Sequence, residues 1–173
     1  PFDIEPPTLA WERELHGFGW LRNLDAVEEE SARKAARRLA VMWVGRFGNS
    51  AGVATEPAVA ARRLISWLSH ASLLLDGADA RTYETVTTSL GRQLAQLSSS
   101  WHEALDGYPR LLCLIALTLA DRSIAGRERH LKEMEATLSA ELDRQILPDG
   151  GHVSRNPSVL VELMLDLLPL SQC

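Results

Sequence analysis

Apolar residues recur at intervals of three and four along almost the whole chain, and no stretch alternates apolar and polar residues as a half-buried strand does. This periodicity predicts an all-α fold. The expected helices, about seven in number, cover residues 8–23, 26–47, 57–76, 79–105, 109–120, 127–146 and a last segment from 157 onward. Residues 1–7 contain three prolines and are expected to form an extended lead-in, after which Thr8 caps the first helix.

Three prolines mark an internal repeat. Pro57, Pro109 and Pro157 each open a strongly apolar helix that follows an amphipathic one, at spacings of 52 and 48 residues. The last of these helices is expected to pack through a stripe of Val161, Leu165 and Leu168. Helical hairpins with apolar inner helices and amphipathic outer helices predict an incomplete α/α toroid, which takes in residues 8–173 as one domain.

Composition narrows the classes of partner. At 173 residues and 46% hydrophobic, the chain has enough apolar material for one globular core. A net charge of -5, with Arg and Glu interspersed, provides no basic stripe for nucleic acid. No apolar run approaches the roughly 20 residues that span a bilayer, so a soluble protein without a membrane partner is expected, in either the periplasm or the cytoplasm. Of the two cysteines, Cys113 is expected to be a small buried hydrophobe and Cys173 ends the chain.

The loop at residues 145–158 is the richest in candidate chemistry. Its turn residues from Pro148 onward must end the preceding helix, and Asn156 is expected to cap the helix that Pro157 opens. His152 is either an acid-base or carboxylate-binding group, or a histidine that ties the loop to a neighbouring helix. Arg155 either grips a carboxylate of a ligand or pairs with Glu162 or Asp166.

Other candidates lie earlier in the chain. The segment from His16 to Trp20 holds two glycines inside an expected helix, each costing up to roughly 1 kcal/mol, so either a close approach or a helix break should explain them. Arg62 and Arg63 lie near the expected rim, where either one of them faces a ligand or they form an ion pair with Glu56 or a solvated helix end. Trp67 and His70 are one turn apart and either form a stacking and hydrogen-bonding pair for a ligand ring, or Trp67 lies in the core. Trp11, Trp43 and Trp101 are expected in the core.

Three segments carry a resemblance to a known family: WERELHGFGWLRNL at residues 11–24, AARRLISWLSH at 60–70 and QILPDGGHVSRNPS at 145–158. In the setting of an α/α toroid they resemble the N-terminal helical domain of heparinase II/III-like proteins, which belong with the polysaccharide lyases. The likeness runs through most of residues 9–172, and the DGGH turn is its most specific part. The resemblance implies a fragment of a longer protein whose C-terminal β-sandwich is absent here.

The function implied by the resemblance is binding of an acidic, uronate-containing polysaccharide and β-elimination in the full-length protein. Elimination needs groups that neutralise the carboxylate, remove a proton and protonate the leaving oxygen. On this basis His152 and Arg155 are the expected catalytic residues, and the polysaccharide groove is expected to be lined by His16, Trp20, Arg62, His70 and Asn156. No cofactor or metal is expected in this fragment, which alone should be inactive; a divalent metal would belong to the absent domain.

The chain departs from the family pattern in two places. Ser154 stands where an acidic residue is expected, and Val159 and Leu160 stand near the place of an expected tyrosine. Residues 107–110 read Gly-Tyr-Pro-Arg where active relatives often carry Asn-His. The alternative interpretation is therefore a non-enzymatic helical scaffold that binds a protein or a sugar. A glycosidase is disfavoured because Asp149 is the loop's only carboxylate and two are needed across a cleft.

Overall fold

The computed structural model describes residues 2–172, so Cys173 lies outside the described residues. Within them the chain is all-α, as predicted, and its one bridge of β type joins Ile146 to His152. The elements are α1 (Leu9–Gly17), α2 (Leu21–Asp25), α3 (Glu30–Phe47), η1 (Val53–Thr55), α4 (Pro57–Ser69), α5 (Ala71–Leu75), α6 (Ala80–Ser100), η2 (Trp101–Glu103), α7 (Tyr108–Ser123), α8 (Glu128–Gln145) and α9 (Pro157–Gln172).

Two expected helices are each divided in the structure. The Thr8 hydroxyl caps α1 by accepting from the Trp11 N–H at 3.1 Å, but Phe18 adopts a left-handed conformation with φ 58° and separates α1 from α2. The helix break is the explanation that the structure supports; the group closest to Gly17 is the Arg62 side chain, which would lie 3.0 Å from a Cβ there, and not another backbone. Similarly, His70 leaves helical geometry and separates α4 from α5. The glycines indicated a possible break at the first position, whereas nothing in the sequence pattern indicated the break at His70.

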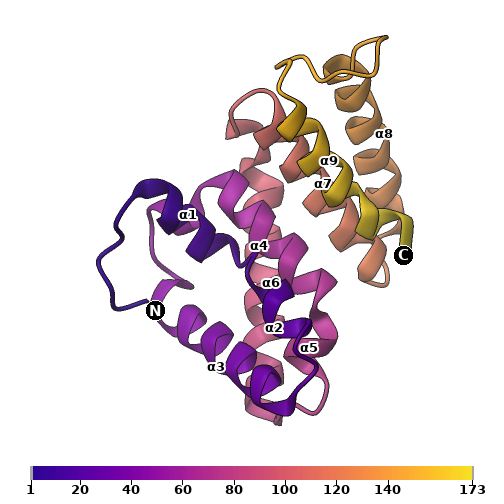
Figure 1. The fold of residues 1–173 in the computed structure, drawn as a ribbon. Helices are drawn as coiled ribbons and strands as arrows, with labels where there is room; N and C mark the ends of the chain where they lie inside the picture. The colour runs from indigo at the N-terminus through magenta and orange to yellow at the C-terminus, as the bar shows by residue number, and fades with distance from the viewer. Residues whose placement is uncertain (1, 173) are drawn as a thin grey trace.

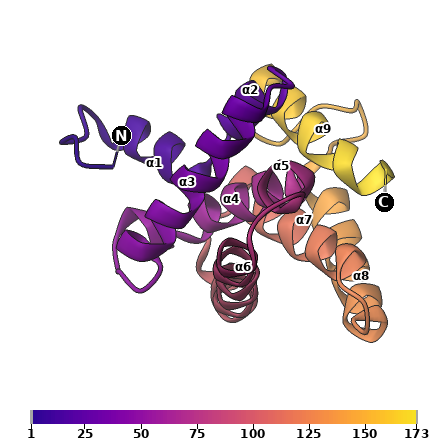
Figure 2. The same cartoon turned by 90° about the horizontal axis from the view of Figure 1, so that it is seen from below.

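The helices α4 and α7 form the centre of the molecule (Figures 1 and 2). Helix α4 packs on α1, α6 and α7, while α7 also packs on α8 and α9. Every residue from Leu111 to Asp121 is buried, which explains why that stretch is apolar nearly all the way round. A second cluster of buried apolar residues joins α1 and α2 to α3, α5 and α6, and Phe2 from the lead-in belongs to it.

The last helix packs through a different face from the one expected. Val161, Leu165 and Leu168 are 56%, 51% and 52% exposed, whereas Leu163 and Leu170 are buried. The reason is that α7 is the main packing partner of α9, so α9 buries one side only. Since α9 is apolar on both sides, its sequence pattern could not indicate which side would be covered.

Arg63 links five elements from inside the protein. Its side chain is 2% exposed, and its guanidinium donates to the carbonyl oxygens of His16 at 2.9 Å and Ala54 at 3.1 Å and to the Gln93 side chain at 2.7 Å. It also lies 4.0 Å from the centre of the Trp43 ring. Burial lowers the pKa of Arg63 to about 9, so the group stays charged at neutral pH. Helices α1, α3, α4, α6 and η1 are thereby tied together.

Replacement of Arg63 by methionine should destabilise the fold strongly. Arg63→Met keeps an apolar stem but leaves the carbonyl oxygens of His16 and Ala54 without their donor, so the free energy of unfolding should fall by about 3 kcal/mol or more. Urea denaturation measures the change. Arg81→Met, an exposed arginine on α6, is the matched control and should change stability by less than about 0.5 kcal/mol. A similar small change for Arg63→Met would show that the buried network is not structural.

The two sides of α9 should respond differently to substitution. Leu163→Ala removes a buried side chain from the α7–α9 contact and should lower the free energy of unfolding by about 2–4 kcal/mol. Leu168→Gln alters an exposed side chain and should cost less than about 0.5 kcal/mol. Thermal and urea unfolding of both variants compare the two faces. Equal losses would mean that the outer face of α9 is covered in solution.

Candidate functional site

A groove runs between the α1–α2 turn, α4 and α9. It consists of two adjoining pockets of about 280 and 270 Å³ that share Gly19, Arg22, Arg62 and Glu162. Glu14, Trp20 and Asn23 extend it toward α1, and His70, Leu165 and Asp166 extend it along α4 and α9. We call this surface the α4–α9 groove.

Arg62 is the central charged group of the groove. Its guanidinium donates to both carboxylate oxygens of Asp166 on α9 and to the hydroxyl of Tyr108 at the start of α7. The Tyr108 hydroxyl in turn donates to Asp166 at 2.6 Å. Because the Asp166 side chain is only 5% exposed and Arg62 is 27% exposed, the pair joins α4 to α9 and leaves part of the guanidinium facing the groove.

At neutral pH each member of the Arg62–Tyr108–Asp166 cluster keeps one protonation state and is hydrogen-bonded to the other two. Burial raises the pKa of Tyr108 well above its ordinary value, so its phenol remains protonated and cannot act as a base. Burial alone would lower the pKa of Arg62, but the hydrogen bond and charge of Asp166 outweigh that effect and raise it. Arg62, Tyr108 and Asp166 therefore satisfy one another, and their role is to hold helices together.

The exposed lining of the groove carries both signs of charge. Glu14 and Glu162 lie on the same surface as Arg22 and Arg62, and Glu162 approaches Arg62 to 3.9 Å. A uniform polyanion would meet the two glutamates unfavourably. A polypeptide surface, with charges of both signs and apolar side chains between them, matches this lining better.

Three of the residues expected to bind ligand are brought together here. Trp20, Arg62 and His70 all line the groove, although none is fully free: Trp20 donates its indole N–H to the Leu15 carbonyl, and a ring nitrogen of His70 lies 3.0 Å from the Asp25 carboxylate. His16, by contrast, is 3% exposed. Its Nδ1 accepts from the Trp43 indole N–H at 3.0 Å, so it belongs to the core and not to a binding surface.

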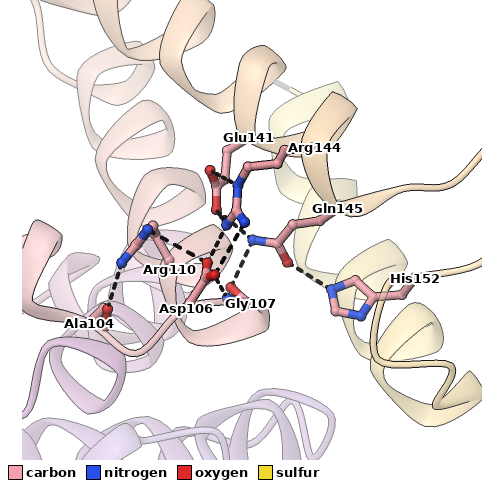
Figure 3. A network of polar contacts seen from close by, with 8 residues as sticks. All are labelled: Ala104, Asp106, Gly107, Arg110, Glu141, Arg144, Gln145 and His152. Atoms are coloured by element: carbon pink, nitrogen blue, oxygen red, sulfur yellow. Dashed lines mark hydrogen bonds and ion pairs between the residues drawn. The ribbon is translucent and has the colours of Figure 1, made fainter.

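His152, Arg155 and Asn156 are not among the residues that line this groove. Figure 3 shows His152 directed toward Gln145. His152 is 3% exposed, its Nε2 donates to the Gln145 side chain at 2.8 Å, and Gln145 donates to the Gly107 carbonyl at 3.1 Å. Of its two interpretations, the structural one holds: His152 ties the loop to the start of α7. Glu141 and Arg144 join the same network through Asp106 and Gln145.

Arg155 and Asn156 are also engaged within the loop. Arg155 donates to Asp149 at 2.5 Å, and not to Glu162 or Asp166 as one interpretation had it. Asn156 accepts from the Ser158 N–H at 3.0 Å, which confirms it as the cap of α9. Hydrogen bonds to near neighbours thus account for the polar composition that made this loop a candidate.

Sequence reasoning missed the structural partner of Arg62. Glu56, the acid considered for Arg62 and Arg63, instead pairs with Arg13 at 2.7 Å. The available signal was the acidic pair Glu162 and Asp166, one turn apart on a helix that is otherwise largely apolar, since a buried carboxylate there needs a cationic partner. Cys113 is buried as expected, and burial raises its pKa to about 12.

Comparison with known proteins shows similarity to a much longer protein. No family model matches the chain, and no solved structure matches it. The chain is similar to FtsZ-localized protein C of Caulobacter vibrioides (strain NA1000 / CB15N). The two are 31% identical over 175 residues, which cover 98% of this chain and 29% of that protein. This chain therefore spans less than a third of the length of that relative.

This similarity corrects the identification as a heparinase II/III-like protein, which was wrong. The expected β-elimination, the acidic polysaccharide partner and the lyase class depended on that identification and are corrected with it. The catalytic roles of His152 and Arg155 lose their basis for the same reason.

In residues 2–172 no group of three His, Cys, Asp or Glu side chains is placed to hold a metal ion, and no helix there is long and apolar enough to cross a membrane.

The stability of the fold should depend on pH through His16. Burial, with the nearby Arg63 charge, lowers the pKa of His16 below its ordinary value of about 6.5. The unfolded chain therefore takes up the proton first as pH falls, so the stability contributed by neutral His16 is complete above about pH 6.5 and is lost below it.

Urea denaturation between pH 7.5 and 5 should show this loss directly. In His16→Asn, which retains an oxygen acceptor for the Trp43 indole but cannot titrate, the free energy of unfolding should fall less steeply with pH than in the wild type. His102→Asn changes an exposed histidine and should leave the wild-type slope unaltered. A slope unchanged in His16→Asn would assign the titration to other groups.

Proposed function

We propose that this chain is a non-enzymatic helical scaffold domain of a cell-division protein and that it associates with FtsZ. The observation that carries the proposal is the 31% identity to FtsZ-localized protein C across 98% of the chain. A similarity distributed over the whole helical domain indicates a shared fold and favours a shared partner. The α4–α9 groove, with its mixed charges, is the surface proposed for that partner.

The chemistry of the groove supports binding over catalysis. Its most buried polar groups, Tyr108 and Asp166, are bonded to Arg62 and to each other, and the Tyr108 phenol is kept neutral by burial. Groups that act as acid, base or nucleophile need a reacting atom within reach and a pKa near the working pH. An interlocked ion pair provides rigidity to a binding surface instead.

The finer architecture is proposed to be an incomplete α/α toroid. The hairpins α6–α7 and α8–α9 each join an amphipathic helix to a more apolar one, and α4 and α7 are covered on several sides. Helix α9 is the third apolar helix of this series and still exposes Val161, Met164, Leu165 and Leu168. In a continuing array this face is the place where the next helix would pack.

Cosedimentation with FtsZ polymers tests the proposed function. The wild-type protein should pellet with polymerised FtsZ and stay in solution with unpolymerised FtsZ. Arg22→Glu and Glu14→Lys each reverse one exposed charge of the groove without touching the Arg62 cluster, and each should weaken the association about tenfold.

Arg129→Glu, an exposed position on α8, is the matched control and should pellet like the wild type. A uniform polyanion as the true ligand would give a different pattern, since Glu14→Lys would then bind more tightly. Absence of the wild-type protein from the FtsZ pellet would refute the proposed partner.

A further inference from the structure

Helix α3 carries positive charge that the protein itself does not neutralise. Most arginines in the described part of the chain pair with an acid, for example Arg13 with Glu56 and Arg122 with Glu135. Lys34 and Arg38 are exposed, and between residues 2 and 172 no acid lies within ion-pair distance of either. In a chain of net charge -5, these two unpaired cations lie one helical turn apart on α3.

Arg37, between them, is fixed by backbone groups. Its guanidinium donates to the carbonyl oxygens of Asp76 and Gly77 in the turn before α6. Its nearest acid, Glu30, is 3.8 Å away and largely exposed. The buried Nε of Arg37 has no partner. Backbone carbonyls orient the group without cancelling its charge, so Arg37 presents a fixed positive charge where α3 meets the start of α6.

These cations surround a groove of about 470 Å³ between α3 and the start of α6. Its apolar part comes from Val41 and from Met42, which is 38% exposed. The one acid in its lining, Asp79, caps α6: it accepts from the N–H and the hydroxyl of Thr82, and these bonds lower its pKa, so it stays an ionised carboxylate. The groove therefore combines three cations, one carboxylate and an apolar surface, so positive charge exceeds negative charge in its lining.

We propose that this α3–α6 groove binds an acidic peptide segment. The carboxylates of the peptide contact the cations of the groove, and an apolar side chain that lies between those carboxylates in the peptide packs on Val41 and Met42. Charge complementarity selects the acidic residues, and the apolar surface of Val41 and Met42 selects the inserted side chain. A concave groove suits a peptide better than the flat surface of a bilayer, which would contact only the outer charges. The inference rests on the proposed function in taking the ligand to be a protein.

Fluorescence anisotropy with a labelled synthetic peptide tests the inference. The probe is a ten-residue peptide with four Asp or Glu around a single Phe, and its two comparison peptides replace the acids by Gln or the Phe by Ser. The wild-type protein should bind the probe at least tenfold more tightly than either comparison peptide. Lys34→Glu/Arg38→Glu should weaken probe binding at least tenfold, and Met42→Gln severalfold.

The matched control is Arg129→Glu/Lys132→Glu, which makes the same change of charge at two exposed positions on α8. It should alter binding less than twofold. An equal loss in this control would show attraction by overall charge and would overturn the inference, as would equal binding of the Ser peptide. Cosedimentation with anionic phosphatidylserine vesicles that is lost in Lys34→Glu/Arg38→Glu, without peptide binding, would assign the surface to lipid and also overturn it.

Parallel FtsZ pelleting separates this inference from the proposed function. Wild-type association with FtsZ, together with no binding of the acidic probe, overturns the α3–α6 inference alone. Probe binding that depends on Lys34, Arg38 and Met42, without FtsZ association, overturns the choice of FtsZ and supports the groove as a peptide site.

Discussion

The enclosed guanidinium of Arg63 is the constraint on which the N-terminal half of the structure depends. A charged group with no room for water must find its partners inside the protein, and here they are two carbonyl oxygens, one amide and the face of Trp43. Those partners come from separate elements, so none can move without leaving a polar group unsatisfied. The break after Gly17 is part of this arrangement, because it directs the His16 carbonyl toward Arg63.

A second buried charge performs the same task for the other half of the molecule. Asp166 on α9 is reached by Arg62 and Tyr108, which come from α4 and α7. Adjacent residues on one helix thus point to opposite sides: Arg63 inward to α1 and α6, and Arg62 outward to α9. Arg62 joins α4 to α9 at the α4–α9 groove, whose lining carries charges of both signs.

Two grooves of different character result on one small helical domain. The α4–α9 groove has charges of both signs and a rigid ionic base, whereas the α3–α6 groove has cations beside an apolar surface. His70, which lines the α4–α9 groove, lies 3.0 Å from the Asp25 carboxylate, and contact with protein is the proposal for both grooves. This division is consistent with a scaffold that holds more than one partner segment, and the similarity to FtsZ-localized protein C supplies the biological setting of the proposal.

The sequence by itself determined the helical class, the proline-led apolar helices and the caps at Thr8 and Asn156, because these depend on neighbours within a few residues. Only the tertiary structure decided which polar groups face solvent. His16 bonds to Trp43, and Arg62 bonds to Asp166, 104 positions away. The sequence does not distinguish a polar residue that binds a ligand from one that forms a hydrogen bond with a distant buried group. Burial of the side chain decides between these two roles, and burial is set by tertiary packing.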